Sequence, residues 1–156
     1  MFNSDYMLLT TKARYAVMAV VDIAEKFCVK PQKIADISAR QNISVNYLEQ
    51  IFNKLKNAKI VASVKGPGGG YKLYHKPEHI YIYDIIKAVA EPVKFTKCTD
   101  VNHSCNNSNI KCQTHFLWKG LEKQVRNYLA NISIADICDG KLAGDKIINE
   151  AKQLRV

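Results

Sequence analysis

Residues 60–74 read IVASVKGPGGGYKLY, and this stretch decides the fold. Two β-prone runs, 60–64 and 71–74, flank a segment with one proline and four glycines, three of them consecutive. Glycine tolerates positive φ and lets the backbone approach a partner closely, so the pattern predicts a β-hairpin with a glycine-rich turn. A phosphate-binding loop is the alternative, but the stretch lacks the G-x-x-x-x-G-K-[ST] pattern and opens no βαβ unit.

Three helices are predicted upstream of this hairpin. Residues 10–27 carry apolar side chains at helical spacing, and residues 32–41 form a second short helix. After the link 42–43, Ser44 is a suitable N-cap for a third helix that continues to about residue 57. Two short helices joined by so brief a turn are typical of the helix-turn-helix motif, whose second helix enters the major groove of DNA.

The third helix has one apolar side and one polar side. The apolar residues are Leu48, Ile51, Phe52 and Leu55. The other side is rich in amides, which can bind adenine bidentately, and a glutamate there can accept from the cytosine amino group. An amide-rich helix face in contact with solvent is the alternative interpretation. The residues that we expect to contact DNA are Lys12, Arg14, Ser44, Asn46, Tyr47, Glu49, Gln50, Asn53, Lys54, Lys65, Gly66, Gly68, Gly69, Gly70 and Tyr71.

The composition agrees with a DNA-binding protein. Lys and Arg number 23 against 14 Asp and Glu, a net charge of +9, and the first 80 residues hold 12 basic and 6 acidic side chains. Such a charge suits a polyanion. The helices and the hairpin in this order predict a winged-helix domain over residues 8–77, preceded by a disordered extension over 1–7. The predicted fold class is therefore mainly α with a small β wing.

The cellular location follows from what the sequence lacks. No apolar run approaches the roughly 18 to 20 residues that a bilayer requires, and the first residues do not have the pattern of a secretory signal. We therefore expect a cytoplasmic protein without a membrane partner.

A second motif consists of Cys98, Cys105, Cys112 and His115 in the spacing C-x6-C-x6-C-x2-H. In a reducing compartment, three cysteines crowded in a segment rich in Asn, Ser and Thr favour ligation over disulfides. The motif predicts an iron-sulfur cluster or a metal ion, and zinc in a tetrahedral Cys3His set is an open alternative. His103 lies in the same segment and is an alternative fourth ligand, whereas Cys28 and Cys138 are expected to be small buried side chains.

The C-terminal part extends this arrangement. Residues 78–112 are expected to form a connecting helix and the ligand loop, and residues 113–156 a long helix followed by C-terminal helices. The long helix carries an apolar stripe made of Leu117, Leu121, Val125, Tyr128 and Leu129. We expect this stripe to pack against the same helix of a second subunit, which gives a two-fold homodimer for a palindromic DNA site. Packing on the winged domain of the same chain is the alternative.

The chain resembles the IscR-type iron-sulfur-responsive transcription regulators of bacteria from residue 8 to about residue 139. The likeness is carried by the stretches 9–17, 35–38, 43–50, 64–71 and 112–118. The resemblance implies a homodimer with one 2Fe-2S cluster per subunit, held by the three cysteines and His115, that represses genes for cluster assembly. It also implies that the apo form binds a second class of DNA site, and that Glu49 helps to discriminate between the two classes.

Two departures from the family pattern concern the wing and the ligand loop. Lys65 stands where close relatives usually have arginine, which reduces a bidentate base contact to a point charge. Each gap between the cysteines is also one residue longer than in the best-known members. A nitric-oxide sensor with a larger cluster has a similar cysteine triplet, but the Cys112-x2-His115 pairing argues against it. A redox or electron-transfer enzyme is disfavoured, because the chain has no C-x-x-C motif and no evident Ser/His/Asp set.

Overall fold

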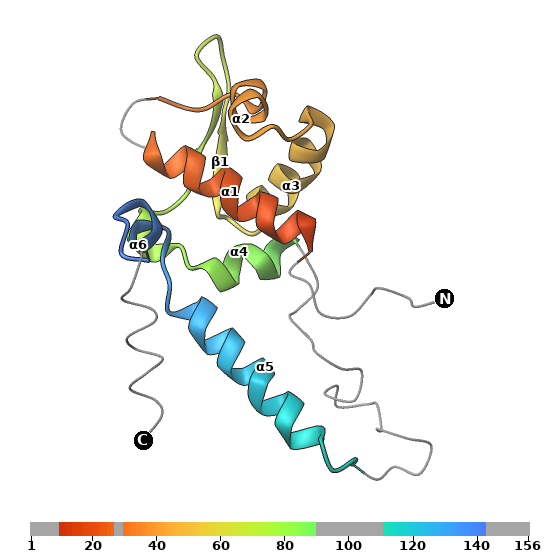
Figure 1. Ribbon diagram of the computed structural model, residues 1–156. Helices are drawn as coiled ribbons and strands as arrows, with labels where there is room; N and C mark the ends of the chain where they lie inside the picture. Colours follow the sequence, from red (N-terminus) through yellow and green to blue (C-terminus); the bar gives the residue numbers. More distant parts are fainter. Residues whose placement is uncertain (1–9, 27–29, 90–110, 143–156) are drawn as a thin grey trace.

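A computed structural model of the chain describes residues 10–26, 30–89 and 111–142. Its elements follow in the order α1 (Thr11–Glu25), α2 (Ile34–Gln41), α3 (Val45–Asn57), β1 (Val61–Val64), β2 (Gly70–Leu73), the 3-10 helix η1 (Pro77–His79), α4 (Ile82–Val89), α5 (His115–Ala130) and α6 (Ile134–Cys138), as Figure 1 shows. Helices dominate, and the two strands form one antiparallel hairpin. The predicted fold class, mainly α with a small β wing, is confirmed.

Helix α1 forms the centre of the core. Ala16, Ala19 and Val20 are completely buried along it, and it contacts α3, α4 and α6. The hydroxyl of Thr10 accepts a 3.2 Å hydrogen bond from the backbone N–H of Ala13, which satisfies one of the unpaired donors at the helix start. The helix ends at Glu25, two residues before the predicted end, and residue 27 lies outside the described residues.

The helix-turn-helix motif is present, with a tight turn between α2 and α3. Asn42 adopts the left-handed conformation, with φ of 53°, and ends α2. The hydroxyl of Ser38 donates a 2.6 Å hydrogen bond to the carbonyl of Ile43, which holds the turn against α2. Ser44 occupies the predicted N-cap position of α3, although its side chain makes no capping hydrogen bond.

The start of α2 differs from the prediction. The helix begins at Ile34 and not at residue 32. Gln32 instead pairs with Tyr71 of the wing, since each backbone N–H donates to the other's carbonyl at 2.8 Å. That pairing requires extended backbone at residue 32, so the helix can begin only after it. The same bridge joins the helix-turn-helix motif to the wing.

The predicted hairpin is confirmed as the wing of the domain. Its strands pair in the register from Val61 opposite Leu73 to Val64 opposite Gly70. The backbone N–H of Gly69 donates a 2.9 Å hydrogen bond to the carbonyl of Gly66. Gly66 itself has a φ of 103°. Only glycine adopts that φ readily, so the composition of the turn is explained by its shape.

A buried ion pair ties α1 to α2. Asp22 is only 2% exposed, and Arg40 reaches it with two nitrogen atoms, Nε at 3.0 Å from Oδ2 and Nη2 at 2.5 Å from Oδ1. Gln41 donates a further hydrogen bond of 2.8 Å to Oδ2, and Nη2 of Arg40 also donates to the side-chain oxygen of Gln32 at 3.1 Å. Burial raises the pKa of Asp22, but the hydrogen bonds from Arg40 and Gln41 outweigh it and hold the pKa below its ordinary value.

We expect Asp22→Ala to lower the free energy of unfolding by about 2 to 4 kcal/mol at pH 7, less than for a fully enclosed pair because Arg40 stays partly exposed. The folded-state pKa of Asp22 is lowered, so its contribution is fully present above about pH 3.9 and is lost as the pH falls through the folded value. Urea unfolding at pH 7 and pH 3 measures the effect. The difference in the free energy of unfolding between wild type and variant should be smaller at pH 3 than at pH 7. An equal difference at the two pH values would contradict the stabilising role of the ionised Asp22.

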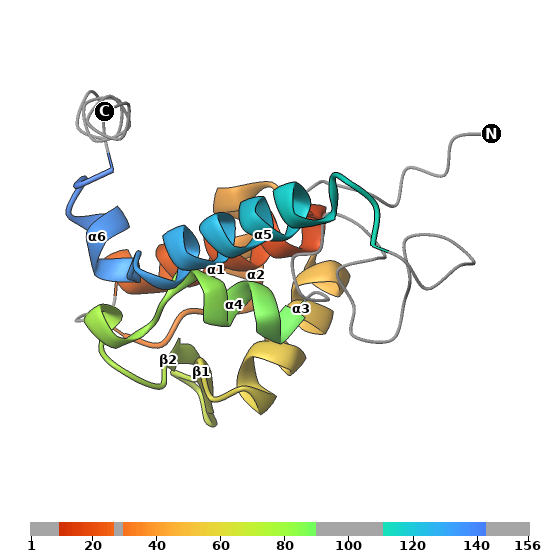
Figure 2. The same ribbon diagram turned by 90° about the horizontal axis from the view of Figure 1, so that it is seen from below.

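The elements after the wing pack on the same core as those before it. Ile85 of α4 is fully buried, and α4 contacts α1. The segment before α4 also pairs with the segment before α6, because the N–H of Ile82 donates to Ile132 at 3.0 Å and the N–H of Ile134 donates to Ile80 at 2.8 Å. Helix α5 contacts α4 on the side away from the wing, as Figure 2 shows, and one buried apolar cluster extends on both sides of residue 77.

Candidate nucleic-acid interface and metal-ligand segment

Helix α3 presents the two sides that its sequence predicts. The side chains of Leu48, Ile51, Phe52 and Leu55 are completely buried. On the opposite side Asn46, Glu49, Gln50 and Asn53 are all exposed. These amides and the carboxylate offer donors and acceptors that match base edges in a major groove. The apolar face of α3 thus fixes the helix on the core, while its polar face stays accessible.

The beginning of α3 lies beside the beginning of α1. The rings of Tyr47 and Tyr15 meet edge to face, with their centroids 5.8 Å apart and an interplanar angle of 89°. Tyr47 is therefore partly buried, while Ser44, just before the helix, is exposed. Of the two basic residues expected at the start of α1, Arg14 is exposed and Lys12 is half-buried. This contact brings the basic end of α1 close to the first turn of α3.

Lys54 differs from the other predicted contacts on α3. Its Nζ donates a 3.1 Å hydrogen bond to the backbone carbonyl of Val89, the last residue of α4. The ammonium group is therefore engaged with another part of the chain.

The tip of the wing is exposed to solvent, whereas its base packs against the rest of the domain. Lys65, Gly66 and Gly68 are exposed at the tip, whereas Gly69, Gly70 and Tyr71 are partly buried. The ring of Tyr71 lies 4.6 Å from that of Phe52, centroid to centroid, so the wing rests on the core side of α3. The exposed lysine suits a phosphate, and the small residues let the backbone approach a groove.

Gly70 allows the wing to approach the helix-turn-helix motif. A Cβ atom at this position would lie 2.5 Å from the carbonyl oxygen of Gln32 and 2.7 Å from its carbonyl carbon. Any larger residue must push the wing away from residue 32 and break the two hydrogen bonds between Gln32 and Tyr71.

We expect Gly70→Ala to lower the free energy of unfolding by about 1 to 3 kcal/mol, because a backbone atom cannot move aside without disturbing the wing. DNA affinity should fall as well, since the wing loses its position. Gly68→Ala is the matched control for stability, because a Cβ there meets no atom within 4 Å. Thermal unfolding measures the change in stability and electrophoretic mobility shifts the change in DNA affinity, and equal thermal stability of the two variants would contradict the role given to Gly70.

Two of the four predicted metal ligands lie among the described residues, at the start of α5. The backbone N–H of His115 donates a 3.0 Å hydrogen bond to the carbonyl of Cys112, so the two residues share one turn of chain. Cys112 is exposed, and its Sγ lies 3.5 Å from the hydroxyl oxygen of Thr114. The His115 side chain is buried, with Phe116 at its edge. A thiol and an imidazole held in one turn suit iron or zinc.

The other predicted ligands, Cys98 and Cys105, and the alternative ligand His103 lie outside the described residues. Within the described ranges, no group of three or more His, Cys, Asp or Glu side chains is arranged to hold a metal ion.

The expectation for Cys138 is wrong. This cysteine, at the end of α6, is exposed and not buried. Partial burial of the sulfur, together with the carboxylates of Glu25 and Asp139, raises the pKa of its thiol. Cys28 lies outside the described residues.

The predicted apolar stripe on α5 divides into two parts. Leu129 packs against the core of its own chain and Val125 is half-buried. In contrast, Leu117, Leu121 and Tyr128 are 62%, 40% and 49% exposed. Of the helices in the described ranges, none combines the length and apolar character that crossing a bilayer requires.

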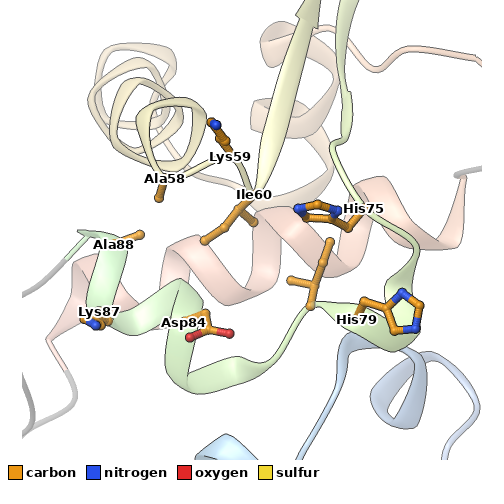
Figure 3. Close-up of a pocket in the computed structure, with 9 residues that line it drawn as sticks. Ala58, Lys59, Ile60, His75, His79, Asp84, Lys87 and Ala88 are labelled. Carbon is orange, nitrogen blue, oxygen red and sulfur yellow. The ribbon is translucent and has the colours of Figure 1, made fainter.

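Two features of the structure have no counterpart in the sequence motifs. One is the network of Asp22, Arg40 and Gln32, for which an acidic residue within the apolar first helix was the only sequence signal. The other is a cavity of about 500 Å³ between the end of α3, the base of the wing and α4, which Figure 3 shows. Exposed His75 and His79 line it, as do Lys59, Asp84 and Lys87. Its lining comes from separate segments without a common motif.

Comparisons with known proteins agree with this geometry. The family model described as Rrf2, iron-dependent transcriptional regulator, matches residues 9–140. The helix-turn-helix transcriptional regulator IscR of Aliivibrio salmonicida is 46% identical over 131 residues, which cover 84% of this chain and 77% of that protein. A putative helix-turn-helix regulator of Haemophilus influenzae is also 46% identical, over 84% of this chain and 86% of its own length.

Solved structures give the same result. IscR of T. potens superposes with a TM-score of 0.68 at 28% identity and covers 96% of this chain and 92% of its own. CymR, the global cysteine regulator of B. subtilis, has a TM-score of 0.74 at 26% identity and covers 85% of this chain and 97% of its own. These relatives are named as transcriptional regulators, so the chain is not an enzyme. It belongs to the Rrf2 family of iron-dependent transcriptional regulators, as a helix-turn-helix regulator of the IscR type.

Proposed function

We propose that this regulator senses iron-sulfur cluster status through a 2Fe-2S cluster and mainly represses genes for cluster assembly. Cys98, Cys105, Cys112 and His115 would hold the cluster. The observation that carries the proposal is the turn at the start of α5, which holds an exposed cysteine and a buried histidine three residues apart. Such a mixed set of thiolate and imidazole ligands is suited to a 2Fe-2S cluster.

The DNA-reading part of the proposal rests on α3 and the wing. Glu49 and Gln50 are exposed side by side on α3, so their functional groups are available to bases. Ser44 at the helix start and Lys65 at the wing tip are exposed as well and would bind phosphates on either side. The basic charge of the whole chain supports association with DNA over a long range.

The histidine ligand suits a sensor. When bound, the cluster supplies a cross-link between the ligand residues and a local change of charge. An imidazole binds iron as a neutral ligand, whereas a thiolate brings a negative charge, so a site with His115 among its ligands would release its cluster more readily than an all-thiolate site. A site that is emptied easily reports on the supply of clusters.

A homodimer is part of the proposal. Leu117, Leu121 and Tyr128 form an exposed apolar face on α5 that the described parts of the chain leave uncovered. A second copy that packs the same face against it would make a two-fold pair and present two α3 helices to a palindromic site.

Spectroscopy of protein purified without oxygen tests the cofactor. We expect visible absorbance, two iron and two sulfide ions per chain, and an electron paramagnetic resonance signal of a 2Fe-2S centre after reduction. Zinc without sulfide, or a cluster with four irons, would replace this assignment with one of the alternatives.

DNA binding is tested by mobility shift at several salt concentrations. Release of counterions from several phosphates should make the binding constant fall steeply as the salt concentration rises.

A further inference from the structure

Lys54 lies where α3 meets α4. It is exposed and predicted to contact DNA, yet its Nζ donates a 3.1 Å hydrogen bond to the backbone carbonyl of Val89. Val89 is the last residue of α4. The carbonyls in the last turn of a helix have no partner within that helix, and a lysine there satisfies one of them and complements the negative end of the helix dipole. Lys54 therefore closes the C-terminal end of α4 from the side of α3.

This hydrogen bond joins two parts of the chain that have different roles. On α3, Glu49 lies five residues before Lys54 and is exposed on the face expected to read bases. Along the chain, Cys98 follows Val89 by nine residues. The two helices are also in direct contact. Helices move as rigid units, so a displacement at the end of α4 is transmitted to α3 through their packing contacts.

We propose that Lys54 is a positioning residue that couples the cluster-ligand segment to the recognition helix, and that it does not bind DNA. This coupling rests on the proposed function. An effector changes DNA affinity only through contacts that differ between two states of the protein. In this proposal the hydrogen bond between Lys54 and Val89 is the contact that differs, because it links the helix that leads to Cys98 with the helix that carries Glu49. A change in its geometry alters how Glu49 meets the bases.

The test compares three variants of the full chain. Lys54→Met removes the donor and keeps most of the aliphatic length, and Lys54→Arg keeps a donor. Lys56→Met is the matched control, because Lys56 is exposed in the same last turn of α3 and the charge change is the same. The probe is the duplex that the cluster-loaded wild-type protein selects from a randomised DNA pool from which duplexes bound by the apo form have first been removed, because the apo form is expected to bind a second class of site. Dissociation constants are measured for the apo and cluster-loaded forms over a range of salt.

For the wild type, the dissociation constant of the apo form divided by that of the cluster-loaded form should exceed 1. In Lys54→Met we expect this ratio to fall toward 1 by about threefold to tenfold, the size expected for one hydrogen bond. The salt slope should keep its wild-type value, Lys54→Arg should restore most of the ratio, and Lys56→Met should leave the ratio unchanged. Hydrogen exchange of the apo protein provides a second readout, in which amides of the last turn of α4 should exchange faster in Lys54→Met.

Three results would overturn this inference, and they are distinguishable. A phosphate contact would show itself if Lys54→Met weakened both forms equally and reduced the salt slope by about 1. A wild-type ratio above 1 that Lys54→Met leaves intact, with unchanged hydrogen exchange, would remove the coupling and keep the proposed function. A wild-type ratio of 1 would remove the proposed function and the coupling with it.

Discussion

Cys112→Ala is expected to abolish the visible absorbance of the anaerobically purified protein and to reduce its bound iron to the background level. The thiolate of Cys112 would be one of four ligands, and a cluster with three remaining ligands is exposed to water and lost. Because Cys112 is itself exposed, removing its side chain should change the free energy of unfolding by only about 0.5 kcal/mol or less. A loss of absorbance would therefore report on ligation and not on folding.

Cys138→Ala is the matched control for this experiment. Cys138 is also an exposed cysteine in the C-terminal half of the chain, but it lies at the end of α6 and outside the turn that joins Cys112 to His115. We expect this variant to retain the absorbance and the iron of the wild type. DNA binding by the apo form of Cys112→Ala should persist at some sites, since the exposed face of α3 does not involve Cys112. Full absorbance in Cys112→Ala, or equal loss in both variants, would contradict the ligand assignment.

The parts of the fold with strong local signals could be predicted from the sequence. The 3.6-residue spacing of Leu48, Ile51, Phe52 and Leu55 identified the buried side of α3, because an amphipathic helix has few other ways to bury those residues. The glycine-rich turn identified the wing, since few residues other than glycine tolerate the φ of 103° at Gly66.

Long-range contacts explain most of what the sequence did not reveal. The start of α2 is set by Tyr71, 39 positions away, whose pairing with Gln32 outweighs the local helix propensity. Asp22 is buried because Arg40, on another helix, neutralises it. Lys54 is exposed as its spacing predicts, but its long side chain also reaches the carbonyl of Val89 on α4. Each of these contacts depends on how helices are placed in space, which periodicity does not specify.

Leu121→Asp is expected to convert the proposed dimer into a monomer. Leu121 and Leu117 are exposed next to each other on one side of α5. Burying a leucine side chain contributes about 1.5 to 3 kcal/mol, and a two-fold interface uses each residue twice. The loss is therefore about 3 to 6 kcal/mol, which corresponds to a factor of about 10² to 10⁴ in the dimer dissociation constant. Analytical ultracentrifugation over a range of protein concentrations measures it.

The same substitution should weaken binding to a palindromic duplex far more than binding to a single half-site. A dimer brings its second recognition helix to the second half-site at high effective concentration, and a monomer loses that advantage. Asn127→Asp is the matched control, because Asn127 is exposed on the polar side of α5 and the substitution adds the same negative charge. If both variants kept the wild-type sedimentation, the face of Leu117, Leu121 and Tyr128 would not be the dimer contact. If both became monomeric, added charge on α5 would be the cause and not loss of apolar burial.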